Sequence, residues 1–242
     1  MRTVRDHDKL YLSERRYDEP KEAFKFMVRC VEDSGPAPAA GALVCDIGCA
    51  AGELAYYLRQ TWPEAQVTGY DLLPELVARA QEMVPGATFR VGSVLDPKMM
   101  APASTDVIFM GGVLSIFDDY KVALRNVLSW LKPGGRAIVF GIFNPDPVDI
   151  IIRSRAANAG EEQPWETGWN VFSVESVGTF LKHCPEKPDV AFHPFSMPID
   201  LPRRAEDPLR SWTESLADGR RMLVNGLCLI HHFMALEIRR PA

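Results

Sequence analysis

The segment 43–58, LVCDIGCAAGELAYYL, joins an apolar run, an aspartate and a loop of small residues. The run Leu43–Asp46 predicts a strand, and the apolar residues that resume at helical spacing predict a helix over Glu53–Gln60. A tight loop between a strand and a helix places backbone N–H groups and the helix N-terminus beside a ligand. The segment therefore predicts a ligand-binding strand–loop–helix unit.

Short apolar runs and helical patterns alternate on both sides of this unit. An amphipathic helix is expected within Lys21–Asp33, laid across the main domain. The further strands are expected at Gln66–Tyr70, Thr88–Val91, Asp106–Met110 and Arg136–Ile142, and the further helices at Pro74–Met83 and Tyr120–Leu131. Regular strand–helix alternation with short links predicts an α/β fold with a mostly parallel sheet and helices on both faces.

The pattern loosens after Phe143. Residues 144–170 hold three prolines and two tryptophans without regular periodicity, which favours a cap over a site. A helix is expected over 173–184 with Ser173 as its N-cap. The tail shows a strand pattern near residues 189–199, a hairpin signal at Asp218–Gly219 and an apolar run over 226–238, and these are expected to add strands at one sheet edge, at least one of them antiparallel.

We interpret the chain as one domain, 1–242. It divides into an N-terminal lid segment (1–40), a cofactor-binding core (41–143), a cap insertion (144–172), and a C-terminal helix with edge strands (173–242).

Composition limits the function classes. The chain has 32 acidic and 27 basic residues, a formal charge of −5 and no long basic run, which argues against nucleic acid as a partner. Its five cysteines are odd in number and form no CxxC pair, so reduced thiols in the cytoplasm are expected and a metal site is not. No signal-peptide pattern and no run long enough to cross a membrane is present. A small molecule is the expected partner, and the oligomeric state stays open, with a homodimer among the options.

The loop departs from two familiar phosphate-binding patterns. In the G-x-G-x-x-G frame that begins at Gly48, Ala50 and Glu53 replace two glycines. No lysine lies between Met27 and Asp71, which excludes the Walker-type loop. Asp46 would repel a pyrophosphate but attract a ligand with ammonium or sulfonium charge, and S-adenosylmethionine carries both.

The residues then form an ordered set that resembles the class I S-adenosylmethionine-dependent methyltransferase family. Its parts are Asp46-x-Gly48-x-Ala50-x-Gly52, Asp71 after the second strand, DVIFMGGVLSIFDD (106–119) and LSWLKPGGRAIVF (128–140). The resemblance covers about Val44–Phe143. Two departures are Ala50, where the usual form has glycine, and Ser93-Val94, where the family often has Gly-Asp.

The resemblance implies a Rossmann-like, seven-stranded, mostly parallel sheet with an N-terminal helical lid and an insertion after strand five. It also implies S-adenosyl-L-methionine as cofactor, bound by Asp46, Gly48, Cys49, Ala50, Gly52, Asp71, Leu72, Ser93, Val94, Gly111 and Gly112. The implied activity, of class EC 2.1.1, is methyl transfer to an O, N or C atom of a small molecule by direct displacement, with secondary metabolism as one setting. The alternatives are a carboxyl O-methyltransferase, favoured if Arg153 or Arg155 faces the methyl group, and a non-catalytic S-adenosylmethionine-binding regulator.

Candidate acceptor-site residues flank this core. The substrate-binding candidates are Tyr11, Tyr17, Ser115, Arg153, Trp165 and Trp169, with lid packing as the competing interpretation. His193, His231 and His232 are candidates for a general base, each against an ordinary structural role. His231 and His232 are adjacent on an expected strand, so they point to opposite faces and cannot chelate one metal together.

Overall fold

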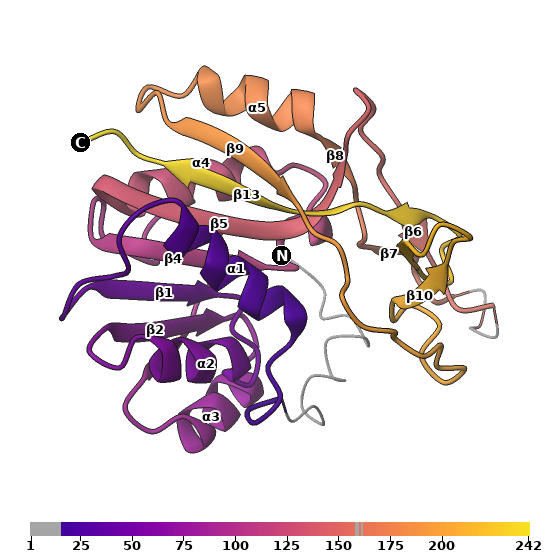
Figure 1. Ribbon diagram of the computed structural model, residues 1–242, viewed down its shortest axis with the longest axis horizontal. Coiled ribbons are helices and arrows are strands. Elements are labelled where there is room, and N and C mark those ends of the chain that lie inside the picture. Colours follow the sequence, from indigo (N-terminus) through magenta and orange to yellow (C-terminus); the bar gives the residue numbers. More distant parts are fainter. Residues whose placement is uncertain (1–15, 158–159, 161) are drawn as a thin grey trace.

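The computed structural model describes residues 16–157, 160 and 162–242. The strands of the main sheet are β1 (Leu43–Ile47), β2 (Gln66–Asp71), β3 (Thr88–Val91), β4 (Thr105–Gly111), β5 (Leu131–Asn144), β9 (Asp189–Pro194) and β13 (Phe233–Arg239). In this part of the chain they follow the order β3-β2-β1-β4-β5-β13-β9 (Figure 1). The strands from β3 to β5 are parallel, and β13 is antiparallel to both β5 and β9. The predicted mostly parallel α/β fold is confirmed, and a short eighth strand, β8 (Phe172–Ser173), pairs with the end of β5 in addition to the expected seven.

Helices cover both faces of this sheet. They are α1 (Glu22–Asp33), α2 (Glu53–Thr61), α3 (Pro74–Met83), α4 (Lys121–Trp130) and α5 (Val174–Lys182), with a 3₁₀ turn, η2 (Leu114–Ile116), after β4. The helices and the main-sheet strands lie where the sequence pattern places them, to within a few residues at their ends. The expected N-cap of α5 is also confirmed, because Ser173 Oγ accepts the Ser176 backbone N–H at 3.0 Å.

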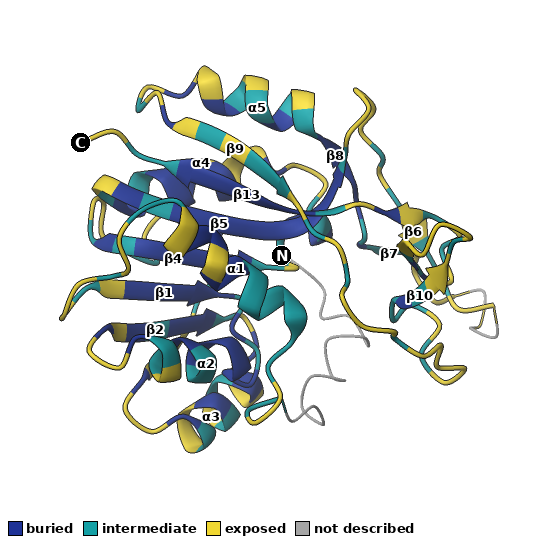
Figure 2. Cartoon of the chain, viewed as in Figure 1, coloured by how far each residue is buried: buried dark blue, intermediate teal, exposed yellow. Residues whose placement is uncertain are grey.

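Alternation along β4 explains the two layers. Ile108 and Met110 face one apolar cluster together with α4 and α5, whereas Val107 and Phe109 face the other with α1, α2 and α3. Successive side chains of a strand point to opposite faces, so a strand buried on both sides reads as a continuous apolar run. Figure 2 shows the central strands buried along most of their length. This rigid double-sided core positions the strand ends.

One expectation for the tail was wrong. The hairpin formed by β10 (Trp212–Ser215) and β11 (Arg221–Val224) does not extend the main sheet but forms a separate three-stranded sheet with β12 (Ile230–His231). The apolar run over 226–238 divides at His232: its first part pairs with β11 and its second part is β13. An apolar run does not record which strand it will pair with, so the sequence pattern could not separate the two parts.

The expected cap, 144–172, contains short pieces of sheet. Strands β6 (Arg153–Ser154) and β7 (Glu166–Thr167) pair antiparallel, a single bridge joins Ile150 to Val171, and β8 (Phe172–Ser173) pairs with the end of β5. Figure 1 places β6, β7 and β10 together beyond the end of the sheet toward which the β1 arrow points. None of the helices in the described residues combines the length and apolar character needed to cross a membrane.

Candidate active site

The β1–α2 loop, residues 48–52, takes a left-handed backbone at alternate positions. The φ angle is +74° at Gly48, +45° at Ala50 and +87° at Gly52. A Cβ on Gly48 would collide with Val113 Cγ2, so a larger residue cannot enter without displacing the Val113 side chain. Ala50 thus adopts the conformation usual for glycine, at a cost of about 1–2 kcal/mol.

Asp71, at the end of β2, holds this loop in place. Its Oδ2 accepts the Ala50 backbone N–H at 2.9 Å, and its Oδ1 accepts the Leu73 backbone N–H at 3.0 Å. Its carbonyl oxygen accepts the Gly92 N–H at 2.8 Å, which brings the chain after β3 beside it. Asp71 therefore joins the carboxyl ends of three strands, β1, β2 and β3.

Asp46 is the most unusual group at this edge. It is 2% exposed, and its Oδ2 has no hydrogen-bond partner among the described residues. Burial first, and then the nearby Asp71 charge, raise its pKa to about 7, with a hydrogen bond from the Ala55 backbone N–H acting in the opposite direction. An unpaired buried carboxylate oxygen is costly, so the site favours a ligand that brings a positive charge or a donor.

The other expected cofactor residues lie at the same edge. Leu72 is 37% exposed beside Asp71, while Val94 is buried after β3. Ser93 Oγ accepts a backbone N–H two residues later, at 3.2 Å. The backbone N–H of Gly112, which has a φ of +70°, donates to the Phe140 carbonyl oxygen at 2.8 Å, and a Cβ on Gly112 would meet nothing within 4 Å. The chain after β4 thus leaves space above the strand end.

Cys49, inside the loop, is a buried side chain that fills space. It is 4% exposed, and burial together with the Asp46 charge raises the pKa of its thiol far above the usual value. A thiol that resists ionisation is a poor nucleophile. Among the described residues no cluster of His, Cys, Asp and Glu could hold a metal ion.

The N-terminal segment, residues 16–21, lies against the β1–α2 loop. The Tyr17 hydroxyl donates to the Ala51 carbonyl oxygen at 2.8 Å, and the Arg16 backbone N–H donates to Glu53 Oε1 at 2.7 Å. Lys21 Nζ lies 3.7 Å from Glu53 Oε2, and Glu53 is only 6% exposed. Glu53, at the start of α2, therefore binds this segment through a buried carboxylate.

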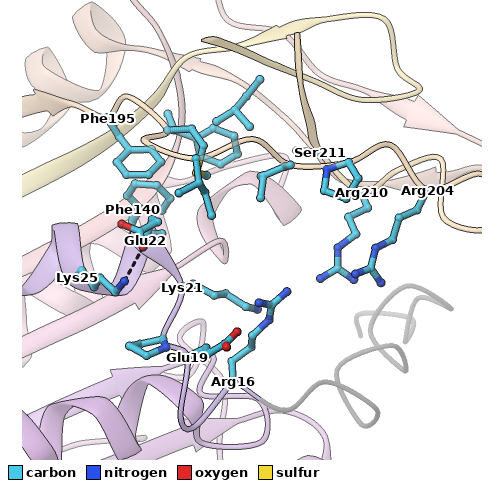
Figure 3. A pocket seen from close by; sticks show the side chains of 18 of the residues that line it. Arg16, Glu19, Lys21, Glu22, Lys25, Phe140, Phe195, Arg204, Arg210 and Ser211 are labelled. Carbon is cyan, nitrogen blue, oxygen red and sulfur yellow. Dashed lines mark hydrogen bonds and ion pairs between the residues drawn. The ribbon is translucent and has the colours of Figure 1, made fainter. Parts of the chain in front are cut away.

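A cavity of about 540 Å³ opens next to this segment, between β5, α1 and the chain that follows β9 (Figure 3). Its apolar lining includes Phe140, Phe195, Met197, Ile199, Leu223 and Phe233, and its basic lining comprises Arg16, Lys21, Lys25, Arg204 and Arg210. None of the loop residues 48–52 lines it. The cavity adjoins the loop through Arg16 and Lys21, and adjoins the end of β4 through Phe140, the Cα partner of Gly111.

Sequence reasoning did not find these cavity residues. The segment 195–211 carries Pro198, Pro202 and Pro208 and no periodic pattern, so it offered no element to place. The one available signal was the group of arginines at 203, 204 and 210 in this proline-rich stretch. It was weak because nothing in the chain order places that stretch opposite residue 16.

The acceptor candidates from the cap lie outside the cavity. Arg153 forms an ion pair with Asp118 at 2.6 Å and donates to Thr167 Oγ1 at 2.9 Å. Trp165 is 60% exposed, and the Arg155 guanidinium carbon lies over its ring, 5.1 Å from the ring centroid. These contacts hold the cap together and anchor it to the chain after η2.

Of the remaining acceptor candidates, Ser115 and Trp169 lie beside or within the cap, whereas Tyr17 lies against the β1–α2 loop. The Ser115 carbonyl oxygen accepts the Asn170 backbone N–H at 2.8 Å, and the ring of Trp169 lies 5.3 Å from that of His231. Of the two tyrosines, Tyr17 contacts the β1–α2 loop as described, whereas Tyr11 lies outside the described residues. The structure therefore places Tyr17 beside the candidate cofactor loop. Trp165 and Arg153 lie in the cap, and Ser115 lies in η2, which contacts the cap.

The three histidines do not line the cavity. His193 Nε2 lies 2.9 Å from Glu237 Oε2, a pairing between β9 and β13. His231 is 6% exposed, and burial lowers its pKa to about 4. His232 is exposed at the break between β12 and β13. His193 is therefore accounted for by its carboxylate partner, whereas the buried Nδ1 of His231 has no hydrogen-bond partner among the described residues.

Comparison with known proteins bears on the part of the chain that contains the β1–α2 loop. Residues 44–135 match the family model of a methyltransferase domain. Over this span the chain is similar to methyltransferases, in agreement with the resemblance to the class I S-adenosylmethionine-dependent family seen in the sequence.

Individual relatives share parts of the chain. It is 30% identical over 122 residues to the trans-aconitate 2-methyltransferase of Rhodopseudomonas palustris strain BisA53, covering 50% of this chain and 46% of the relative. The chain thus spans about half the length of the curated relatives it matches.

Solved structures share the fold over nearly the whole chain. The YcgJ protein of Bacillus subtilis has a TM-score of 0.60 at 14% identity, covering 90% of this chain and 99% of that one. The 1,6-didemethyltoxoflavin-N1-methyltransferase of Burkholderia thailandensis, solved with 1,6-didemethyltoxoflavin and S-adenosylhomocysteine, has a TM-score of 0.57 at 16% identity, covering 100% and 93%. At this identity the likeness shows the fold alone.

Proposed function

We propose that this chain is an S-adenosylmethionine-dependent methyltransferase that transfers a methyl group to an O, N or C atom of a small-molecule acceptor. The observation that carries the proposal is Asp46, a buried carboxylate with an oxygen left unpaired among the described residues. An ammonium group that approaches the β1–α2 loop would offset the cost of this burial. The name of the curated relatives, trans-aconitate 2-methyltransferase, supports a small acceptor.

The residues at the strand ends fit such a ligand. Asp46 and the left-handed β1–α2 loop would hold its amino acid end, with Gly48 and Gly52 giving the backbone close approach. Asp71 would accept hydrogen bonds from the ribose hydroxyls, as an acid after the second strand does in related nucleotide folds. Ser93 and Val94 would lie along the adenine, beside the Asp71 backbone.

When bound, S-adenosylmethionine supplies a methyl group on a sulfonium leaving group, which an acceptor lone pair displaces in line. The chain has to hold the acceptor collinear with that bond and keep water out. Phe140, which lies next to Gly111 and Gly112, is placed to hold the acceptor. The N-terminal segment is placed to keep water out. No histidine lines the cavity in the described residues, so a base, where the acceptor requires one, would come from Asp18, Glu19 or Glu22.

The carboxyl O-methyltransferase alternative now rests on different residues. Neither Arg153 nor Arg155 supports it, because Arg153 is paired with Asp118 and Arg155 lies over Trp165. The arginines that line the cavity, by contrast, support it. A carboxylate acceptor needs no general base, which agrees with the absence of histidine from the described residues that line the cavity.

A non-catalytic regulator remains the alternative from another class. Its sequence hints were Ala50 and Ser93. Ala50 follows the backbone path of a glycine, which weakens that hint, and a cavity of about 540 Å³ beside the loop favours turnover.

Isothermal titration with S-adenosylmethionine and S-adenosylhomocysteine tests the proposal. We expect wild-type protein and Asp96→Asn, a charge-matched control after β3, to bind equally, and Asp71→Asn to bind at least about tenfold more weakly. Absence of binding by the wild-type protein, or equal binding by the Asp71 variant, would contradict the cofactor assignment. Binding without methyl transfer to any member of a broad small-molecule panel would favour the regulator.

A further inference from the structure

Two buried polar atoms of the described residues have no hydrogen-bond partner there, Asp46 Oδ2 and His231 Nδ1. Buried polar groups in folded proteins are nearly always paired, because an unpaired one is costly. Close to His231 in the chain, Asn225 follows this rule: it donates to the Leu209 carbonyl oxygen at 3.1 Å and accepts the Leu227 N–H at 3.0 Å. Asp46 lies at the proposed cofactor site, whereas His231 lies elsewhere and needs an explanation of its own.

His231 lies directly behind the wall of the cavity. It is 6% exposed at the end of β12, and its Cα partner on β11 is Leu223. Side chains directly opposite each other in an antiparallel pair lie on the same face of the sheet. The His231 ring centroid is also 5.9 Å from that of Phe233. Because Leu223 and Phe233 both line the cavity, His231 lies one layer of side chains behind its wall.

A row of aromatic rings leads from the end of β4 to His231. Phe140, the Cα partner of Gly111, stacks on Phe233 with ring centroids 5.4 Å apart and an interplanar angle of 15°. Beyond Phe233 lie His231 and then Trp169, whose ring centroid is 5.3 Å from that of His231. A flat molecule that packs along this row has one end at the end of β4 and its other end at His231.

Trp169 is held beside His231 in an unfavourable backbone conformation. Its φ angle is +61°, in the left-handed region that residues other than glycine rarely adopt. The next residue, Asn170, imposes this conformation: its N–H donates to the Ser115 carbonyl oxygen at 2.8 Å, and its side chain accepts the Ile152 N–H at 2.7 Å. Strained residues that the fold holds in this way cluster at ligand sites. A strained residue and an unpaired buried atom are therefore neighbours here.

Burial narrows the chemistry of a group that can pair with His231. It lowers the pKa of the imidazole to about 4, with the His232 charge acting in the same direction, so the ring is neutral at neutral pH. A charged ligand group would lose its hydration there without gaining an opposite charge on the ring. A hydroxyl or an amide both donates and accepts, so it fits either tautomer of the neutral ring.

We propose that His231 recognises the acceptor: when the half-buried Phe233 side chain turns aside, Nδ1 forms a hydrogen bond with an uncharged hydroxyl or amide group at the end of the acceptor that lies away from the methyl transfer. This inference rests on the proposed function, because it names a chemical feature of the substrate of the same site. It concerns the far end of the acceptor and holds whichever atom is methylated. It also gives the contact between the cap and β12 a role in recognition.

The test uses the intact protein saturated with S-adenosylhomocysteine. Its four probes share one flat body: 2-naphthol, 2-naphthamide, 2-naphthoate and 2-methylnaphthalene. Isothermal titration measures their affinities. We expect 2-naphthol or 2-naphthamide to bind about tenfold or more tightly than 2-methylnaphthalene, which lacks the hydrogen bond, and than 2-naphthoate, which brings a charge.

Matched variants separate recognition from packing. His231→Phe should weaken binding of the preferred neutral probe by about tenfold and change that of 2-methylnaphthalene by less than about threefold. His231→Leu, which needs less room, should behave in the same way, and His231→Asn, which keeps a polar group near the position of Nδ1, should retain part of the preference. Since the two apolar variants remove an unpaired buried atom, their melting temperatures should equal or exceed that of the wild-type protein. His232→Phe is the control, because His232 is exposed and one position further along the chain.

The outcomes distinguish this inference from the proposed function. Failure of the wild-type protein to bind S-adenosylhomocysteine would overturn the proposed function. If that binding is intact, equal affinities for 2-methylnaphthalene and the two neutral polar probes, or equal losses in the His231→Phe and His232→Phe variants, would overturn the role of His231 alone. Tighter binding of 2-naphthoate than of either neutral polar probe, or no binding of these two probes to the loaded protein, would overturn it as well.

Discussion

The Tyr17 hydroxyl donates a hydrogen bond to the Ala51 carbonyl oxygen, 2.8 Å away and 34 positions further along the chain. Through this bond and the contacts of Glu53 with Arg16 and Lys21, the N-terminal segment rests directly on the β1–α2 loop. The same segment contributes Arg16 and Lys21 to the cavity. One short stretch of chain therefore contacts the proposed cofactor loop and the proposed acceptor site together, and we expect it to couple the two sites.

Removing that hydroxyl should weaken the coupling. We expect Tyr17→Phe to bind S-adenosylhomocysteine about three- to tenfold more weakly, because one partly buried hydrogen bond contributes about 1 kcal/mol. Tyr57→Phe, on the adjacent helix α2, is the matched control. Isothermal titration measures the affinities, and equal affinities of the two variants would show that the contact has no part in binding.

Asp46→Asn should stabilise the protein without its cofactor. The folded chain holds the Asp46 proton up to a pKa of about 7, whereas the unfolded chain releases it near 3.8. The stability that Asp46 contributes therefore falls as pH rises between these values, and asparagine escapes this loss. At pH 8 we expect a gain on the order of 2 kcal/mol, seen as a melting temperature about 5 °C higher, with a much smaller gain at pH 4. An equal gain at both pH values would contradict the assignment.

Cofactor affinity should depend on pH in the opposite sense. A cationic ligand favours the ionised Asp46 carboxylate, so binding of S-adenosylmethionine should tighten as pH rises through about 7. We expect the Kd of the wild-type protein at pH 6 to be about tenfold higher than at pH 8. The Asp46→Asn variant should bind weakly at both values, and a wild-type affinity that is flat across this range would argue against a charge on Asp46.

Ala50 and Gly48, two small residues of the β1–α2 loop, should respond differently to a change of side-chain size. Ala50→Gly should retain cofactor affinity within about twofold and change stability by no more than about 1 kcal/mol, since relief of the left-handed φ and the added freedom of the unfolded chain oppose each other. Gly48→Ala should lose several-fold in affinity, because its Cβ would meet Val113 Cγ2. Val113→Ala in the same chain should restore part of that loss. If Val113→Ala does not restore affinity to the Gly48→Ala variant, the loss of affinity comes from backbone strain alone.

Buried and exposed contacts of the cap should differ in strength. Asn170 is fully buried and donates to the Phe117 carbonyl oxygen at 2.8 Å while accepting the Ile152 N–H at 2.7 Å, so Asn170→Ala should cost about 2–4 kcal/mol. The ion pair of Arg153 with Asp118 is solvent-exposed, and Arg153→Gln should cost less than about 1 kcal/mol. Urea denaturation measures both, and equal losses would mean that the ion pair anchors the cap.

The local sequence pattern determines most of the helices and strands that form the core of this protein. The alternation of Ile108 and Met110 with Val107 and Phe109, and the proline that begins α3, depend on neighbours only a few positions away. For the same reason the residues expected to contact the cofactor, from Asp46 to Gly112, fall at strand ends on one edge of the sheet: parallel strands joined by helices all end on the same side.

The acceptor side depends on contacts that local patterns do not encode. Arg16, Phe140 and Arg204 come from three parts of the chain, and the path of the proline-rich segment after β9 determines that they share one cavity. The division of the last apolar run at His232 likewise follows from pairing with two different sheets. Sequence alone determined the α/β order and the strand–loop–helix unit, because periodicity and backbone conformation are local properties. Only the tertiary structure decided which charged groups meet across the cavity, because that depends on how segments nearly two hundred residues apart pack together.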